Sequence, residues 1–303
     1  MARQPKIIQF NYLTIIRILL NNKTSLSAML LCCLLSADNQ WLSLTKKQEL
    51  TISGMARFKN GYVVVHDNKT ANKPRVSYID NNYNINKINW DSKSNNILPF
   101  DLEGITSIPL YPNQFILMES SGRSYRVFID PKESKITLIS IFQLPLVTNI
   151  INLEGIEMYK TNGLYTIIYG DRGSDDRPST LFSGKYNVVN DVISDITTFI
   201  IDFTKPTKYK RNIADLSLDK FNNLWCVATS DPGDTGPFET FLYIVGSISK
   251  SGQLLLQKQF KPRLYFPGQK VEALMFSQDY IFLMTDNESF GASFYEKQIL
   301  DIR

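Results

Sequence analysis

Carboxylates recur at one position of a short phrase that this sequence repeats. The phrase occurs at 102–105 (LEGI), 153–156 (LEGI) and 271–274 (VEAL), with looser copies at 52–55 (ISGM) and 214–217 (ADLS). After each copy comes a turn and a second apolar run that ends at or just before an acidic residue. Hard cations such as Ca²⁺ bind sets of carboxylate oxygens, so the repeat is the strongest indication of chemistry in the chain.

The repeat also predicts how these acids are positioned. Each copy and the run after it read as two antiparallel strands joined by a hairpin, because the turns are rich in Asn, Gly and Asp. The start of the first strand then lies beside the end of the second. The acids should therefore meet in pairs: Glu103 with Glu119, Glu154 with Asp171, Asp215 with Asp231, and Glu272 with Asp286. In the first copy Ser53 takes the acidic place, with Asp67 behind it.

The elements that carry these pairs predict an all-β fold. Two further strand-like runs follow most of the hairpins, and units of roughly 50 residues with four short strands are typical of β-propeller blades. Five blades are expected, and six are the alternative because the third and fourth units are longer. The last unit lacks an outer strand, which the segment 40–50 can supply, closing the ring without an open edge.

In a propeller the first strand of each blade lines the central channel. We therefore expect Glu103, Glu154, Asp215 and Glu272 around one mouth, with Glu119 and Asp171 behind them, and we interpret these six residues as candidate ligands of Ca²⁺. Carboxylates crowded together repel one another unless a cation balances them. Two alternatives remain open: the acids can accept backbone N–H groups of the next blade and join blade to blade, or they can act directly in catalysis.

The loops after the second strands form another candidate site. The segment 171–178 (DRGSDDRP) contains Arg172 and Arg177, and loops that begin at Asp231 and Asp286 rise on the same face. Guanidinium groups bind phosphate or carboxylate through two parallel hydrogen bonds. These four residues are therefore candidates for binding a small anionic ligand, although the arginines can equally pair with acids of their own loop.

The histidine and cysteine residues limit the other kinds of site that the chain can form. His66 is the only histidine, which excludes a zinc site built on histidines, and no Gly-x-Ser-x-Gly motif accompanies it. We expect His66 on the rim of the channel. Cys226 lies within an apolar run and is expected in the core.

The N-terminal region differs from the rest of the chain. Residues 1–24 carry four basic and no acidic residues, and the apolar stretch 25–37 (SLSAMLLCCLLSA) follows. This order predicts a signal peptide cleaved after Ala37, or an N-terminal membrane anchor, in front of one propeller domain at 38–303. The apolar stretch is shorter than the roughly 20 residues that span a bilayer. We expect a periplasmic or extracellular protein.

The residues of the second copy also carry a family resemblance. Asp101-Leu102-Glu103-Gly104-Ile105, followed by Ile116-Leu117-Met118-Glu119, resembles the D-x-E-G-I … S/A-E signature of the phytase-like, esterase-like and SdiA-regulated propellers. The resemblance implies a secreted or periplasmic propeller with Ca²⁺ at the channel mouth. It also implies hydrolysis of phosphate esters by a metal-activated water. Glu103, Glu119, Glu154 and Glu272 match the family's acidic positions, whereas Ser53 departs from them.

Two classes of function follow. One is a metal-dependent hydrolase of phosphate or other esters, and the other is a non-enzymatic propeller that binds a ligand or a protein partner. The net charge of +4 is small and the basic residues are scattered, so no nucleic-acid partner is expected. We expect a monomer.

Overall fold

The computed structural model describes residues 41–90 and 97–299, and they form an all-β fold. The expected signal peptide or anchor at 1–37 lies outside the described residues. Within the described ranges there are 22 strands and two short 3-10 helices, η1 (Gln48–Leu50) and η2 (Glu288–Phe290). No helix among these residues is long and apolar enough to cross a membrane.

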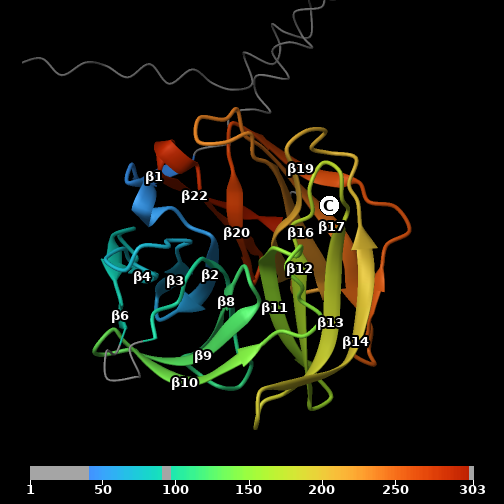
Figure 1. Ribbon diagram of the computed structural model, residues 1–303, viewed down its shortest axis with the longest axis horizontal. Coiled ribbons are helices and arrows are strands. Elements are labelled where there is room, and N and C mark those ends of the chain that lie inside the picture. The colour runs from blue at the N-terminus through green and yellow to red at the C-terminus, as the bar shows by residue number, and fades with distance from the viewer. Residues whose placement is uncertain (1–40, 91–96, 300–303) are drawn as a thin grey trace, which may run out of the picture. The chain divides into compact units, whose positions relative to one another are not determined.

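The strands form five sheets that follow one another around a central axis (Figure 1), and all their pairings are antiparallel except that of β6 with β10. Blade 1 contains β2 (Gly54–Phe58), β3 (Gly61–Val65), β4 (Val76–Ile79) and β5 (Ile85–Lys87). Blade 2 contains β7 (Leu102–Ser107), β8 (Gln114–Glu119), β9 (Arg123–Asp130) and β10 (Lys135–Gln143), with β6 (Asn89–Trp90) beside β10. Blade 3 contains β11 (Leu153–Thr161), β12 (Leu164–Asp171), β13 (Ser179–Asn187) and β14 (Val192–Ile201).

The fourth and fifth blades depart from the simple four-strand order. Blade 4 contains β15 (Lys210–Leu218), β16 (Asn223–Ser230), β17 (Glu239–Ile248) and the short β18 (Leu254–Leu256), and β19 (Pro262–Pro267) also pairs with β17. Blade 5 contains β20 (Val271–Ser277), β21 (Tyr280–Thr285) and β22 (Ala292–Gln298). The extra length of the third and fourth units therefore forms longer strands and β19 rather than a sixth blade.

The ring is closed by the strand that the sequence predicts. The segment β1 (Leu42–Thr45) pairs antiparallel with β22, with Leu42 opposite Phe294, so blade 5 has the order β1-β22-β21-β20. Figure 1 shows β1 beside β22, although they come from opposite ends of the described chain. This pairing confirms a five-bladed propeller closed by an N-terminal strand.

The small residue of the repeated phrase is required by crowding at the axis. A Cβ added to Gly104 would lie 2.8 Å from Cγ2 of Ile156 in the next blade. A Cβ on Gly155 would lie 2.8 Å from Cγ of Leu216, again in the next blade. The inner strands therefore approach too closely for a larger side chain at these two positions.

Apolar side chains fill the spaces between neighbouring blades. Between blades 3 and 4 the rings of Phe203 and Tyr243 are stacked with centroids 3.9 Å apart, and Cys226 is buried in the same cluster. Between blades 5 and 1, Tyr62 packs against Phe282 and Phe294 at 5.7 and 5.6 Å. The buried apolar side chains form four clusters, which lie between neighbouring blades.

Candidate functional site

The repeated glutamates lie at bulges where the inner strands begin. In blade 2, Leu102 pairs with Glu119 and Gly104 with Met118, so Glu103 is the extra residue of the ladder. Glu154 of β11 and Glu272 of β20 occupy the same kind of bulge. A bulge turns one side chain out of the regular alternation. It therefore explains why these glutamates can face the channel mouth from strands that are otherwise apolar.

Two basic residues balance one part of this mouth. The guanidinium of Arg211 on β15 lies 2.9 Å from Oε1 of Glu154 and 3.3 Å from Oε1 of Glu272, and it also pairs with Asp231. The ammonium of Lys270, which is only 2% exposed, lies 3.1 Å from Oε1 of Glu272 and 3.4 Å from Oδ2 of Asp231. The distances show an ion-pair network that joins blades 3, 4 and 5.

Asp286 and Glu288 complete this ion-pair network from blade 5. Oδ2 of Asp286 lies 3.8 Å from the Lys270 ammonium, which also pairs with Glu288. Burial disfavours the charge of Lys270, yet its acidic neighbours dominate and raise its pKa. Sequence reasoning did not assign Arg211 or Lys270 to the site, because neither belongs to the repeated phrase.

Asp215 lies apart from the other channel acids. Its carboxylate accepts hydrogen bonds from the backbone N–H of Leu216 at 2.8 Å and of Leu274, on the next blade, at 2.6 Å. Glu157 of blade 3 likewise accepts from the backbone N–H of Leu218 on blade 4 at 3.0 Å. These contacts favour the blade-joining role that the sequence left as an alternative for Asp215.

The carboxylate of Glu119 is hydrogen-bonded to neighbouring residues. It accepts hydrogen bonds from the backbone N–H of Phe100 at 2.8 Å and from the hydroxyls of Tyr125 and Ser121 at 2.5 and 3.1 Å. These donors occupy both oxygens of its carboxylate.

Each of the two candidate arginines pairs with an acid of the mouth: Arg177 with Asp171, and Arg172 with Glu154. Arg177 holds Asp171 through both of its terminal nitrogens, one of them at 3.1 Å from Oδ1, and the backbone N–H of Asn152 donates to Asp171 at 3.0 Å. Arg172 lies 3.2 Å from Oε1 of Glu154. The structure therefore places Arg177 on Asp171, while Arg172 faces the mouth with a third of its side chain exposed.

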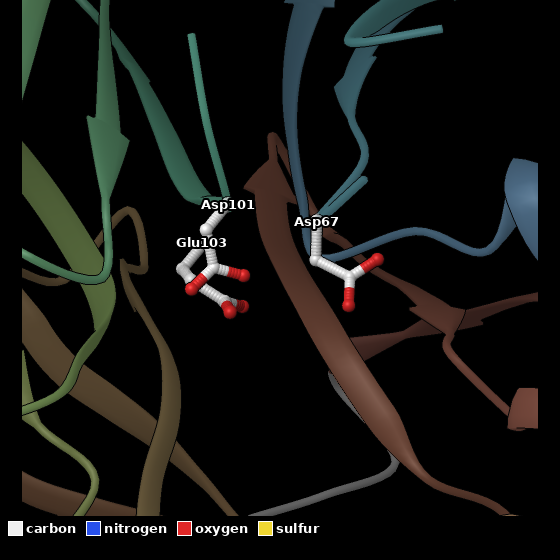
Figure 2. A group of neighbouring side chains, drawn as sticks. All are labelled: Asp67, Asp101 and Glu103. Carbon is white, nitrogen blue, oxygen red and sulfur yellow. The ribbon is translucent and has the colours of Figure 1, made fainter. Parts of the chain in front are cut away.

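A separate trio of acids lies on the blade 1 and blade 2 side of the mouth. Asp67, Asp101 and Glu103 each offer a carboxylate oxygen, and these oxygens all lie within 4.8 Å of one another. Figure 2 shows the carboxylates of Asp101 and Glu103 side by side, with Asp67 facing them from another segment. Three such groups are an arrangement that could hold a metal ion.

Among the described residues, Lys69 forms an ion pair with one member of this trio, whereas Arg211 and Lys270 pair with other acids of the mouth. Lys69 lies 3.0 Å from Oδ1 of Asp101, and the Ser120 hydroxyl donates to Oδ2 of Asp101 at 2.6 Å. Neither Asp67 nor Glu103 has a hydrogen bond or ion pair with any residue of 41–90 or 97–299. The trio therefore retains capacity to accept hydrogen bonds or to bind a cation.

Burial shifts the pKa values of acids on both sides of the mouth. Burial, then repulsion by Glu154 and Asp101, raises the pKa of Glu103 well above its usual range. Burial and the neighbouring Asp101 raise the pKa of Asp67 as well. At Asp231 burial opposes ionisation, but Arg211 and Lys270 outweigh it and lower the pKa. Burial also raises the pKa of Glu272 well above its usual range and that of Asp286 to about 6, although Lys270 opposes both shifts.

A buried acceptor without a partner adds to this evidence. Glu154 is 2% exposed, and its Oε2 has no hydrogen-bond donor among the described residues although Oε1 pairs with Arg172 and Arg211. Repulsion from Glu154 contributes to the raised pKa of Glu103. The unfilled oxygen therefore belongs to the same acidic mouth.

Only part of the trio was named from sequence. Glu103 is among the predicted ligands, whereas Asp101 was noted only as part of the family signature and Asp67 only as the acid behind Ser53. Asp67 could have been found, because it follows the second strand of blade 1 as Asp171 and Asp286 follow theirs. His66, expected on the rim, is instead fully buried between the carbonyl of Thr51 and the hydroxyl of Ser77, at 2.6 and 2.8 Å.

No protein-family model matches this sequence, and no curated protein matches it. Among solved structures, an endo-1,4-β-xylanase from Bacteroides thetaiotaomicron is 10% identical with a TM-score of 0.52, over 83% of this chain and 91% of that one. A β-1,2-mannobiose phosphorylase from Listeria innocua is 6% identical with a TM-score of 0.50, over 87% and 91%. A third structure, a glycoside hydrolase, is 10% identical with a TM-score of 0.48 over 85% of this chain, which spans 61% of its length.

At these identities the likeness extends to the fold. The chain is a five-bladed β-propeller with an acidic Asp/Glu cluster, similar in fold to glycoside hydrolases and a phosphorylase.

Proposed function

We propose that this propeller binds a hard divalent cation, Ca²⁺ first, at the channel mouth through Asp67, Asp101 and Glu103. The observation that carries the proposal is the spacing of the three carboxylates, whose oxygens lie within 4.8 Å of one another. Ca²⁺ takes six to eight oxygen ligands, and three carboxylates offer up to six. No histidine or cysteine belongs to the trio, which favours Ca²⁺ or Mg²⁺ over zinc.

The ligand that such a cation would help to bind is a small anion. A bound cation would turn the trio from a repulsive to an attractive surface for phosphate or carboxylate. Lys69, with 58% of its side chain exposed, pairs with Asp101 of the trio, and Arg172, with 34% exposed, pairs with Glu154 of the same mouth, so both are available to an anion there. A protein partner that presents an acidic side chain is the alternative occupant.

A hydrolase is the second candidate. The observation that favours it is Asp231, whose pKa is lowered by Arg211 and Lys270 against the effect of burial, so that it stays ionised on the same mouth as the proposed cation. An ionised carboxylate is suited to the role of general base. A cation at the trio would polarise the substrate and lower the pKa of a water. Phosphate esters and glycosidic bonds are the candidate substrates, the latter from the names of proteins with a similar fold.

An extracytoplasmic location fits the proposed cation. Sites of modest affinity, with dissociation constants of about 0.1–1 mM, are typical of extracellular calcium modules. We therefore propose that residues 1–37 direct the chain out of the cytoplasm. Sequencing the N-terminus of protein from the extracytoplasmic fraction tests this, with Asp38 expected if cleavage follows Ala37.

Calcium titration of the chain from Asp38 onward tests the binding proposal. We expect Ca²⁺ to raise the melting temperature and to bind with measurable heat in calorimetry. Glu103→Gln and Asp101→Asn should each weaken binding at least tenfold. Asp176→Asn removes an exposed acid from a loop on the same face and should leave binding unchanged. The proposal is wrong if Ca²⁺ gives neither heat nor a shift, or if the Glu103 and Asp101 variants bind like the parent chain.

Activity assays then separate the two candidates. Phosphate monoesters, phosphodiesters, carboxyl esters and xylan should be tested with Ca²⁺ and with chelator. Turnover that Glu103→Gln removes supports the hydrolase. Calcium binding without turnover of any of these substrates supports a propeller that binds a ligand without catalysis.

A further inference from the structure

A second pocket lies on the face of the propeller opposite the acidic mouth. It has a volume of about 330 Å³ and is formed where blade 1 meets blade 5, the junction at which the ring closes. Its lining comes from the hairpin ends of both blades. The aromatic members are Tyr62, Tyr83, Tyr280 and Phe282, and the polar members are Arg57, Asn60, Asp80, Asn81 and Glu296.

The aromatic side chains form a floor and two exposed walls. Tyr62 and Phe282 are buried with ring centroids 5.7 Å apart, whereas Tyr83 and Tyr280 are 37% and 39% exposed. The ring of Tyr83 lies 5.1 Å from Phe294, and that of Tyr280 lies 6.2 Å from Phe282. The two outer rings are thus supported from behind and still present surface to solvent.

The backbone at Tyr83 is held in an unusual conformation. Its φ is +62°, a region that bulky residues rarely adopt. The turn is fixed by Asp80, whose carboxylate accepts from the backbone N–H groups of Asn82 and Asn84 at 2.9 and 3.0 Å and whose carbonyl accepts from Tyr83 at 2.9 Å. These hydrogen bonds fix the turn and hold the Tyr83 ring at the pocket wall.

The polar groups around these rings carry opposite charges. Arg57 lies over the ring of Tyr62, with its guanidinium carbon 5.3 Å from the centroid, and Glu296 belongs to the opposite wall on β22. Burial raises the pKa of Tyr62 to about 12, with Arg57 and Glu296 acting on it in opposite directions. Asp80 stays ionised as the cap of its turn, because the hydrogen bonds from Asn84 and Asn82 lower its pKa, so the lining carries two carboxylates and one guanidinium.

We propose that this pocket binds a neutral saccharide. The apolar faces of a pyranose ring can pack on Tyr83 and Tyr280. Its hydroxyls, which both donate and accept, match the guanidinium, carboxylate and side-chain amides of Arg57, Glu296 and Asn60. The two carboxylates disfavour an anion, and the guanidinium of Arg57 over the Tyr62 ring disfavours a quaternary ammonium ion. This site is independent of any cation at the acidic mouth.

Affinity electrophoresis tests the proposal on the chain from Asp38 onward. Native gels would contain soluble xylan, galactomannan, mixed-linkage β-glucan or starch. We expect at least one polysaccharide to slow the protein, and Tyr83→Ala and Tyr280→Ala each to raise its dissociation constant at least fivefold. Both side chains are more than one third exposed, so the variants should fold, and unchanged melting temperatures verify this. Tyr280→Phe keeps the ring and should keep binding.

The matched control is Tyr209→Ala, which removes an exposed tyrosine from the loop before β15 and should leave migration unchanged. The proposal is overturned if none of the four polysaccharides slows the protein. It is also overturned if both alanine variants are slowed as much as the parent chain, since binding then lies elsewhere. Calorimetric binding of tetramethylammonium without binding of any saccharide would assign the pocket to a cation instead.

Discussion

Lys270 is the residue whose removal most directly tests the balance of charge at the channel mouth. In Lys270→Met the ammonium that lies 3.1 Å from Glu272, 3.4 Å from Asp231 and 3.8 Å from Asp286 is replaced by an apolar chain of similar length. Glu272 and Asp231 keep Arg211 as a partner. Asp286 loses the only cation that the described residues place within 4 Å of it.

The size of the effect follows from burial. Breaking one side of a buried ion pair costs about 3–5 kcal/mol, because a charge is left without compensation. Burial already raises the pKa of Asp286 to about 6 even though Lys270 lowers it. Without Lys270 that pKa must rise further, and a carboxyl group with a raised folded pKa loses stability as the pH rises. The deficit should therefore be about 3–5 kcal/mol at pH 7.5 and clearly smaller at pH 5.

Thermal and urea denaturation in the presence of chelator measure this. For a chain of this size a loss of 3–5 kcal/mol corresponds to roughly 10 °C in melting temperature. Lys185→Met is the matched control, because Lys185 pairs with Asp195 at 2.7 Å while both side chains are more than half exposed, and a surface pair contributes about 0–1 kcal/mol. A Lys270→Met variant within 1 kcal/mol of the parent chain at pH 7.5, or with an equal deficit at pH 5, would refute the reasoning.

Three further predictions concern single side chains. Burial lowers the pKa of His66 from 6.5 to about 4. In the presence of chelator the free energy of unfolding should therefore fall by about 3 kcal/mol as the pH falls from 6.5 to 4. His66→Gln should flatten this pH dependence in a series of melting temperatures. Asp215→Ala leaves the backbone N–H groups of Leu216 and Leu274 without their acceptor. It should lower the free energy of unfolding by about 2–4 kcal/mol in urea denaturation and leave the calcium affinity unchanged. A loss of calcium affinity would show that Asp215 is a ligand after all. Phe203→Ala removes a 1% exposed ring stacked on Tyr243 and should cost about 3–5 kcal/mol, and a change below 1 kcal/mol would contradict the packing.

Much of the fold could be predicted because it depends on local pattern. The hairpins follow from turns such as Asn60-Gly61 and from apolar runs that fit a strand, and both signals lie within a few residues of each other. The place of Gly104 and Gly155 follows from the same repeat, since every blade must bring its inner strand to the axis. Even ring closure could be inferred, because the last unit lacked an outer strand.

The candidate site could be predicted only in part. The repeat identifies Glu103, Glu154 and Glu272 as channel residues, but it treats all copies as equal. Blade 4 breaks the pattern, since the ladder shifts between Arg211 and Asp215. Arg211 therefore stands at the mouth, and Asp215 lies where it joins two blades. No feature of the short phrase signals that shift.

The sequence by itself determined that carboxylates from several blades would share one mouth, because the period of the repeat sets one such residue per inner strand. Only the tertiary structure decided which of these carboxylates pair with a basic residue of the same chain. Lys270 and Arg211 pair with acids of blades 3, 4 and 5, whereas the trio of Asp67, Asp101 and Glu103 has one ion pair among the described residues, from Lys69 to Asp101. The reason is physical: ion pairs act over a few ångströms, and those distances exist only once the ring has closed and blades distant in sequence have become neighbours.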